Sequence, residues 1–223
     1  EGHAIFVQSD DHKNDDAKSL RDRAEKALGT KLGGDETQHL ACEKWLDVRA
    51  FGQLFALPKM KKGKKEGEEE GDTGISIGIR GPVTVQSAFS VEPIDISSLQ
   101  ITKSVSGEGD GTKRGSDTMG MKHRVDLGIY VFYGSMNPQL AEKTKFTEAD
   151  AEAIKTVLPT LFENDESSAR PSGSMEVMKV IWWRHNCRSG QYSSAKVHRS
   201  LSVAKDGSIS LQNLEGLVPE VIE

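Results

Sequence analysis

The chain has few cysteines, few aromatic side chains and no long apolar run. Its two cysteines, Cys42 and Cys187, lie far apart in the sequence. This is not the pattern of a disulfide framework, and it favours a reducing, cytoplasmic setting. Nothing approaches the roughly 20 apolar residues that a membrane-spanning helix needs, and no signal-peptide pattern opens the chain. With 223 residues the chain can still bury a core, so we expect a globular protein without a membrane partner.

The motifs of common catalytic and metal-binding sites are also absent. The six histidines and two cysteines show no C-x-x-C or H-x-x-x-H spacing. There is no glycine-rich phosphate loop ending in Lys-Ser/Thr and no G-x-S-x-G. We therefore expect no metal, no cofactor and no catalytic residue. His123, flanked by Lys122 and Arg124, is the one histidine to test as a general acid or base on RNA.

Charge is unevenly distributed along the chain. The net charge is −5, which argues against a general nucleic-acid-binding surface. Residues 103–124, however, carry 5 Lys/Arg against 3 Asp/Glu, and residues 170–199 carry 6 against 1. A local basic surface built from these two segments is the form of nucleic-acid binding that the composition leaves open.

Apolar residues at helical spacing predict three helices, over 14–29, 35–57 and 146–165. Asn14 or Asp15 can cap the first helix. In the third, Thr147 with Asp150 resembles a capping box, and Pro159 should produce a kink.

Alternating apolar and polar residues predict the strands. They lie over 75–96, broken at 81–82, and over 98–105, 125–132, 174–186, 195–203 and 208–214. Because residues 125–132 are apolar on both faces, we expect that strand at the centre of its sheet. The polar, glycine-rich segments 58–74 and 106–117 cannot bury apolar surface. We expect a disordered loop over 58–74, and either a disordered loop or the tip of a long hairpin over 106–117. Helices and strands do not alternate strictly, which indicates an α+β fold with a largely antiparallel sheet.

Two segments could contact nucleic acid. Lys122, His123 and Arg124 follow a glycine-containing turn, where backbone amides and three donors could hold phosphates. Residues 178–192 interleave lysine and arginine with tryptophan and tyrosine, so that bases could stack on the rings while the cations follow the phosphates. A buried strand followed by a basic turn explains the second segment equally well.

Four blocks in a fixed order resemble a known family. They are "DVRAFG" (47–52), "IRGPVTVQSAFSVEPIDI" (79–96), "TMGMKHRVDLGIYVFYGSM" (118–136) and "LFENDESSAR" (161–170). Together they resemble the backbone subunits of subtype I-C Cascade, which are CRISPR-associated members of the repeat-associated mysterious protein (RAMP) superfamily. The similarity extends loosely over nearly the whole chain.

The resemblance implies a modified RNA-recognition-motif (RRM, ferredoxin-like) fold. The palm would carry a largely antiparallel sheet, and insertions would form fingers and a thumb. We expect a single domain over residues 1–223, with 58–74 as a disordered charged loop and 103–124 as a candidate thumb. The implied function is non-catalytic: copies of the subunit would polymerise head to tail along CRISPR RNA and present the guide to target DNA. Other Cascade subunits would be further partners in this antiviral ribonucleoprotein.

The resemblance also implies the RNA-binding residues, which we list in chain order: Arg49, Arg80, Lys103, Thr118, Met119, Gly120, Lys122, His123, Arg124 and Arg170. Met121 stands where the family usually has a basic residue, so Arg124 could supply a missing phosphate contact. Asp165 and Arg170 are expected to be partly structural. The first palm strand and an Asn/Gly-rich loop of the family have no counterpart here, so we expect an N-terminal segment to be missing.

Two alternatives stay open from the sequence. One is an endoribonuclease of the same superfamily that uses His123. The other is a protein-only scaffold without RNA contact, which the clustered basic segments disfavour.

Overall fold

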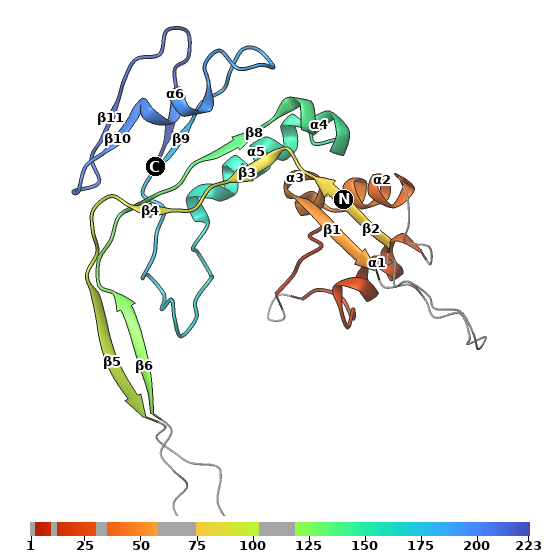
Figure 1. Ribbon diagram of the computed structural model, residues 1–223, viewed down its shortest axis with the longest axis horizontal. Helices are drawn as coiled ribbons and strands as arrows, with labels where there is room; N and C mark the ends of the chain where they lie inside the picture. Colours follow the sequence, from red (N-terminus) through yellow and green to blue (C-terminus); the bar gives the residue numbers. More distant parts are fainter. Residues whose placement is uncertain (1–2, 10–12, 30–34, 58–74, 103–118) are drawn as a thin grey trace, which may run out of the picture. The chain divides into compact units, whose positions relative to one another are not determined.

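The computed structural model describes residues 3–9, 13–29, 35–57, 75–102 and 119–223. The chain divides into two compact units (Figure 1). Unit 1 contains residues 1–85, 134–197 and 213–223, and unit 2 contains residues 86–133 and 198–212. The predicted segments 58–74 and 106–117 lie outside the described residues.

Unit 1 combines helices with short antiparallel strand pairs. Its helices are α1 (Leu20–Leu28), α2 (Asp35–Lys44), α3 (Leu46–Phe51), α4 (Pro138–Thr144), α5 (Glu148–Val157) and the 3₁₀ turn η2 (Leu158–Thr160). Its strand pairs are β1 (Gly52–Leu57) with β2 (Ile75–Arg80), β3 (Val83–Val85) with β8 (Gly134–Met136), and β9 (Val180–Trp182) with β12 (Glu220–Ile222). Helix α6 (Ser194–Arg199) begins in this unit and ends in unit 2.

Unit 2 contains three antiparallel pairs among its described residues. They are β4 (Phe89–Ser90) with β7 (Tyr130–Val131), β5 (Ile96–Thr102) with β6 (Met119–Val125), and β10 (Leu201–Val203) with β11 (Ile209–Leu211). The expected mixture of helices and antiparallel strands is therefore confirmed.

The core of unit 1 is built on three aromatic rings. The ring of Phe6 lies 4.6 Å from that of Trp45 and 5.3 Å from that of Phe55. Smaller buried side chains from α1, α2, α3 and β2 complete the cluster: Ala24, Ala41, Cys42, Val48 and Ile79. The burial of these side chains fixes α1 to α3 against the β1–β2 pair.

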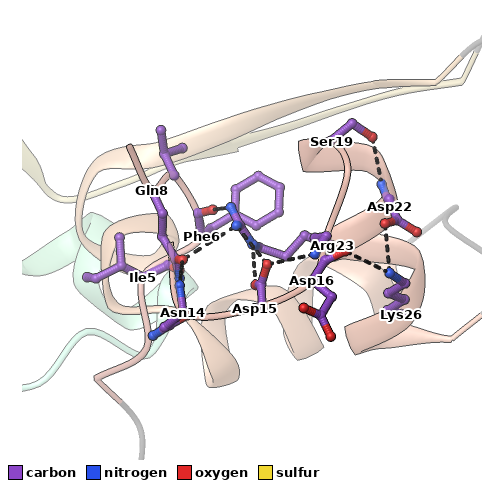
Figure 2. Close-up of polar contacts among 12 residues, drawn as sticks. Ile5, Phe6, Gln8, Asn14, Asp15, Asp16, Ser19, Asp22, Arg23 and Lys26 are labelled. Atoms are coloured by element: carbon purple, nitrogen blue, oxygen red, sulfur yellow. Dashed lines mark hydrogen bonds and ion pairs between the residues drawn. The ribbon is translucent and has the colours of Figure 1, made fainter. Parts of the chain in front are cut away.

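Helix α1 begins later than predicted because the expected cap has another partner. The Arg23 guanidinium is buried and donates to Asp15 Oδ2 at 2.6 Å, to Asp15 Oδ1 at 2.9 Å and to the Phe6 carbonyl at 2.6 Å (Figure 2). This contact lowers the pKa of Asp15 to about 2. Ser19 caps the helix instead, its hydroxyl accepting from the Asp22 amide at 3.1 Å.

The predicted helix over 35–57 is confirmed as far as Phe51, with a break at Trp45, and is wrong from Gly52 onward. Trp45 has an extended backbone that separates α2 from α3, and Gly52, with φ 85°, ends α3 and begins β1. A Cβ on Gly52 would lie 2.2 Å from the Ile79 carbonyl oxygen, and one on Gly81 would lie 2.2 Å from that of Ala50. The "DVRAFG" and "IRGP" segments thus meet backbone to backbone, at a separation that only glycine permits.

Other boundaries also differ from the prediction. The capping box of α5 is confirmed, since Thr147 and Asp150 bond reciprocally, but Pro159 lies in η2 and the α-helix ends before it instead of kinking. The predicted strand 195–203 is wrong in its first half, which forms α6 before β10 begins. Residues 126–129 belong to no strand, so the predicted strand 125–132 is interrupted. Leu127 in this stretch is 86% exposed, and the segment is therefore not a central strand.

Candidate nucleic-acid interface

Strands β5 and β6 form an exposed two-stranded ribbon in unit 2 (Figure 1). All seven residues of β6 are exposed, and so are all residues of β5 except Ser97. The pairing runs from Ile96 opposite Val125 to Thr102 opposite Met119. The ribbon therefore presents side chains to solvent on both of its faces.

The basic triplet lies inside this ribbon, which corrects the expectation that a strand begins only at Val125. Pairing with β5 extends the strand back to Met119. Because successive side chains of a strand alternate between its faces, Lys122 and Arg124 share one face and His123 lies on the other. The three donors therefore cannot all point at the same stretch of phosphate backbone.

The face with Lys122 and Arg124 also carries Ser97, Leu99 and Ile101 from β5. Arg124 Nε donates to Asp126 Oδ1 at 2.8 Å, and the Ser97 hydroxyl donates to the other oxygen of that carboxylate. These hydrogen bonds, that of Ser97 first and then that of Arg124, lower the pKa of Asp126. The contact between Arg124 and Asp126 is exposed, so a phosphate could replace the carboxylate at small cost.

The opposite face carries His123 with a hydroxyl partner. His123 Nδ1 lies 2.8 Å from Ser98 Oγ, and the Gln100 amide nitrogen lies 3.0 Å from the Met119 sulfur. Met121 and Val125 are exposed on this face as well. The face combines apolar side chains with one imidazole, which is less suited to phosphates than the Lys122 face.

Arg49 and Arg80, two of the predicted arginines of unit 1, have different environments. Arg49 is buried: Nη2 lies 2.6 Å and Nε 3.0 Å from the two carboxylate oxygens of Asp150. Burial alone would raise the pKa of Asp150, but the hydrogen bonds from Arg49 and Thr147 outweigh burial and lower it. Arg80, at the end of β2, is exposed. Of the two, only the Arg80 side chain is open to solvent.

The remaining predicted positions fall into two groups. Lys103 and Thr118 lie outside the described residues. Arg170 forms an exposed ion pair with Asp165, with 3.0 Å between Nη2 and Oδ2. This pair is consistent with the partly structural role expected for that segment.

The basic segment 178–192 has carboxylate partners within unit 1. Arg184 pairs with Glu148 at 2.8 Å, Arg188 pairs with Glu142, and Lys179 pairs with Glu223. Trp182 and Trp183 are half-buried. Charge neutralisation and partial burial both favour the simpler of the two sequence interpretations, a packed strand followed by a basic turn.

Sequence analysis missed another feature of unit 2, a hollow of about 360 Å³ lined by residues of the β4–β7 pair, its flanking segments and β10. Its lining residues are Gln86, Ser87, Phe89, Ser90, Val91, Val131, Tyr133 and Val203. Phe89 is 73% exposed, and the Tyr133 ring stacks on His198 at 4.3 Å. A solvent-facing phenyl ring is a surface on which a base can stack. In the sequence, Phe89 showed only the alternation of an ordinary strand.

Among the residues that the structure describes, no three His, Cys, Asp or Glu side chains gather as a metal-ligand group. Likewise, none of the described helices has the length and apolarity required to cross a bilayer.

Comparison with known proteins identifies the family. The model of the CRISPR-associated protein Cas7 family matches residues 1–216. The chain is also 25% identical over 179 residues to the CRISPR-associated protein Cas7 of Haloferax volcanii, an alignment that covers 79% of this chain and 52% of that protein. The chain thus spans about half the length of this curated relative. It belongs to the Cas7 family.

Proposed function

We propose, from this family membership, that the chain is a non-catalytic backbone subunit of a subtype I-C Cascade complex in the cytoplasm. Copies of it would polymerise along CRISPR RNA, together with other Cascade subunits, and hold the guide for pairing with target DNA. The observation that carries the proposal is the exposed β5–β6 ribbon, which displays Lys122 and Arg124 on one face. We take this ribbon as part of the thumb, and the helices and strand pairs of unit 1 as part of an RRM-like palm.

Phosphate contacts would supply most of the affinity for RNA. The proposed contacts are Arg80, Lys122 and Arg124, with Lys103, Thr118, Met119, Gly120, His123 and Arg170 as further members of the matching blocks. Binding should therefore weaken steeply with salt and depend little on base sequence. Because Arg49 is held by a buried carboxylate, we assign it to the support of the fold that carries these contacts.

The decisive experiment measures assembly on CRISPR RNA by gel filtration. Replacing Lys122, His123 and Arg124 together by alanine should abolish assembly while circular dichroism and thermal unfolding stay unchanged, because the triplet lies on an exposed ribbon. Replacing Lys179, Arg184 and Arg188 is the matched control, since these three cations already have carboxylate partners. Assembly that survives the first triple substitution would overturn the proposal and support a protein-only scaffold.

Incubation of the pure protein with repeat RNA in EDTA tests the enzymatic alternative. We expect intact RNA. Specific cleavage that disappears in His123→Ala would instead support an endoribonuclease in which His123 acts as acid or base.

A further inference from the structure

A basic hollow lies between α2 and α4 in unit 1, outside every predicted site. It has a volume of about 200 Å³ and is lined by Gln38, His39, Cys42, Lys143 and Lys145. This is smaller than the roughly 300–1,000 Å³ of pockets that hold drug-sized ligands. The lining offers two ammonium groups, an imidazole and an amide, but no carboxylate. Its size and donors suit a small oxyanion.

The position of Lys145 is the most informative detail of this hollow. Lys145 follows the last turn of α4 in the left-handed region, with φ 59° and ψ 28°. Glycine is the preferred residue at this position of a helix end, because a side chain there is sterically disfavoured. Its Nζ lies 3.0 Å from His39 Nε2. An ammonium group can only donate, so the imidazole nitrogen is its acceptor.

The cations of this hollow differ from the others around α4 and α5. Arg184, Arg188 and Lys155 each form an ion pair with a carboxylate. Among the side chains that the structure describes, neither Lys143 nor Lys145 has a carboxylate within 4.0 Å. An anion bound in the hollow would neutralise Lys143 and Lys145, as carboxylates of the chain neutralise the other three cations.

We propose that Lys143, Lys145 and Gln38 bind a phosphate group, with His39 positioning the Lys145 ammonium. A phosphate can accept hydrogen bonds from both ammonium groups and from the Gln38 amide at the same time. The phosphate could come from a nucleic-acid strand or be a free ion. Only the first source rests on the proposed function.

The test uses Lys145→Gly, which removes the ammonium group and gives the backbone the residue it prefers at this position. The matched control is Asn164→Gly, because Asn164 is the other described non-glycine residue with positive φ, at 58°. Both variants are made in the intact protein. The ring signals of histidine are followed by NMR, and the His39 signal is assigned from its loss in His39→Asn.

Inorganic phosphate is the first probe and single-stranded RNA the second. Phosphate should shift the His39 signal in the unmodified protein and in Asn164→Gly, but not in Lys145→Gly. RNA affinity in Lys145→Gly should fall about five- to tenfold at moderate salt. The slope of log K against log salt should also fall by about one, as for the loss of one phosphate contact.

Each outcome decides the proposal. If phosphate shifts the His39 signal and Lys145→Gly also weakens RNA binding, the phosphate comes from a nucleic-acid strand. If phosphate shifts the signal but RNA binding is unchanged, the site binds the free ion. If phosphate does not shift the His39 signal, and Lys145→Gly and Asn164→Gly bind RNA with the same affinity, the site does not exist. The Lys122/Arg124 double variant, measured in parallel, shows separately whether the proposed function fails.

Discussion

Arg49 and Asp150 form a buried, two-pronged ion pair across 101 positions of sequence, with 2.6 Å between Nη2 and Oδ1 and 3.0 Å between Nε and Oδ2. Asp150 also accepts from the amide and the hydroxyl of Thr147, both at 2.9 Å. The pair therefore connects α3 to the capping box of α5.

Arg49→Ala should destabilise the protein by about 3–5 kcal/mol, because it leaves a buried carboxylate without its cation. Chemical denaturation followed by circular dichroism measures this change. Arg170→Ala is the control, since it breaks an Arg–Asp pair that is exposed, and it should cost less than about 1 kcal/mol. Equal effects of the two substitutions would contradict the structural role assigned to Arg49.

The glycines where "DVRAFG" meets "IRGP" should tolerate no side chain. Gly52→Ala and Gly81→Ala would each place a Cβ 2.2 Å from a backbone oxygen, so we expect a loss of at least about 2 kcal/mol or a failure to fold. Gly78 lies in β2, three positions before Gly81, and a Cβ there would meet nothing within 4 Å, so Gly78→Ala should change the stability by less than about 1 kcal/mol. Thermal unfolding of the three variants checks the difference.

Acid should weaken the contact between Asp15 and Arg23. The pKa of Asp15 is lowered from 3.8 to about 2 in the folded chain, so the contact contributes its full stability above about pH 4 and loses it as the pH falls towards 2. Asp15→Asn should therefore flatten the dependence of the unfolding free energy on pH in this range, by up to about one proton.

Asp16→Asn serves as the control for this measurement, because Arg23 contacts Asp15 and not Asp16 among the described residues. It should leave the slope between about pH 4 and pH 2 as in the unmodified protein. If Asp15→Asn and Asp16→Asn give the same curve, the Arg23 contact does not set the acid response.

The two faces of the β5–β6 ribbon should contribute differently to RNA binding. The double change Lys122→Ala/Arg124→Ala should reduce the slope of log K against log salt by about two, because two phosphate contacts are lost. His123→Ala lies on the opposite face and should leave the slope nearly unchanged. Fluorescence anisotropy at several salt concentrations measures both variants, and a larger effect of His123→Ala would assign RNA to the other face.

Local signals in the sequence predicted local structure well. The capping box of α5 was confirmed because Thr147 and Asp150 lie three positions apart and satisfy each other. The second partner of Asp150 could not be predicted in the same way, since nothing local relates it to a residue 101 positions earlier. The α1 cap failed for a different reason: Arg23, only eight positions after Asp15, engages its carboxylate and so removes the expected helix cap.

Periodicity failed where one conformation ended and another began. The spacing of Phe51, Leu54 and Phe55 fits a helical stripe as well as a short strand. The positive φ of Gly52 ends the helix, so the residues after it form β1. The sequence predicted a strand that begins only after the basic triplet, at Val125, whereas the triplet lies within β6. It could not predict which donors share a face, because that depends on the pairing of β6 with β5.

The β5–β6 ribbon also has a kinetic consequence. No third described strand pairs with β5 or β6, and a two-stranded ribbon exposed on both faces is only marginally stable in water. Its backbone amides should therefore exchange with deuterium quickly in the isolated protein. An assembly that covers the ribbon would slow this exchange without changing any backbone hydrogen bond. Amide protection along 96–102 and 119–125 would then report how completely each copy is engaged by its surroundings.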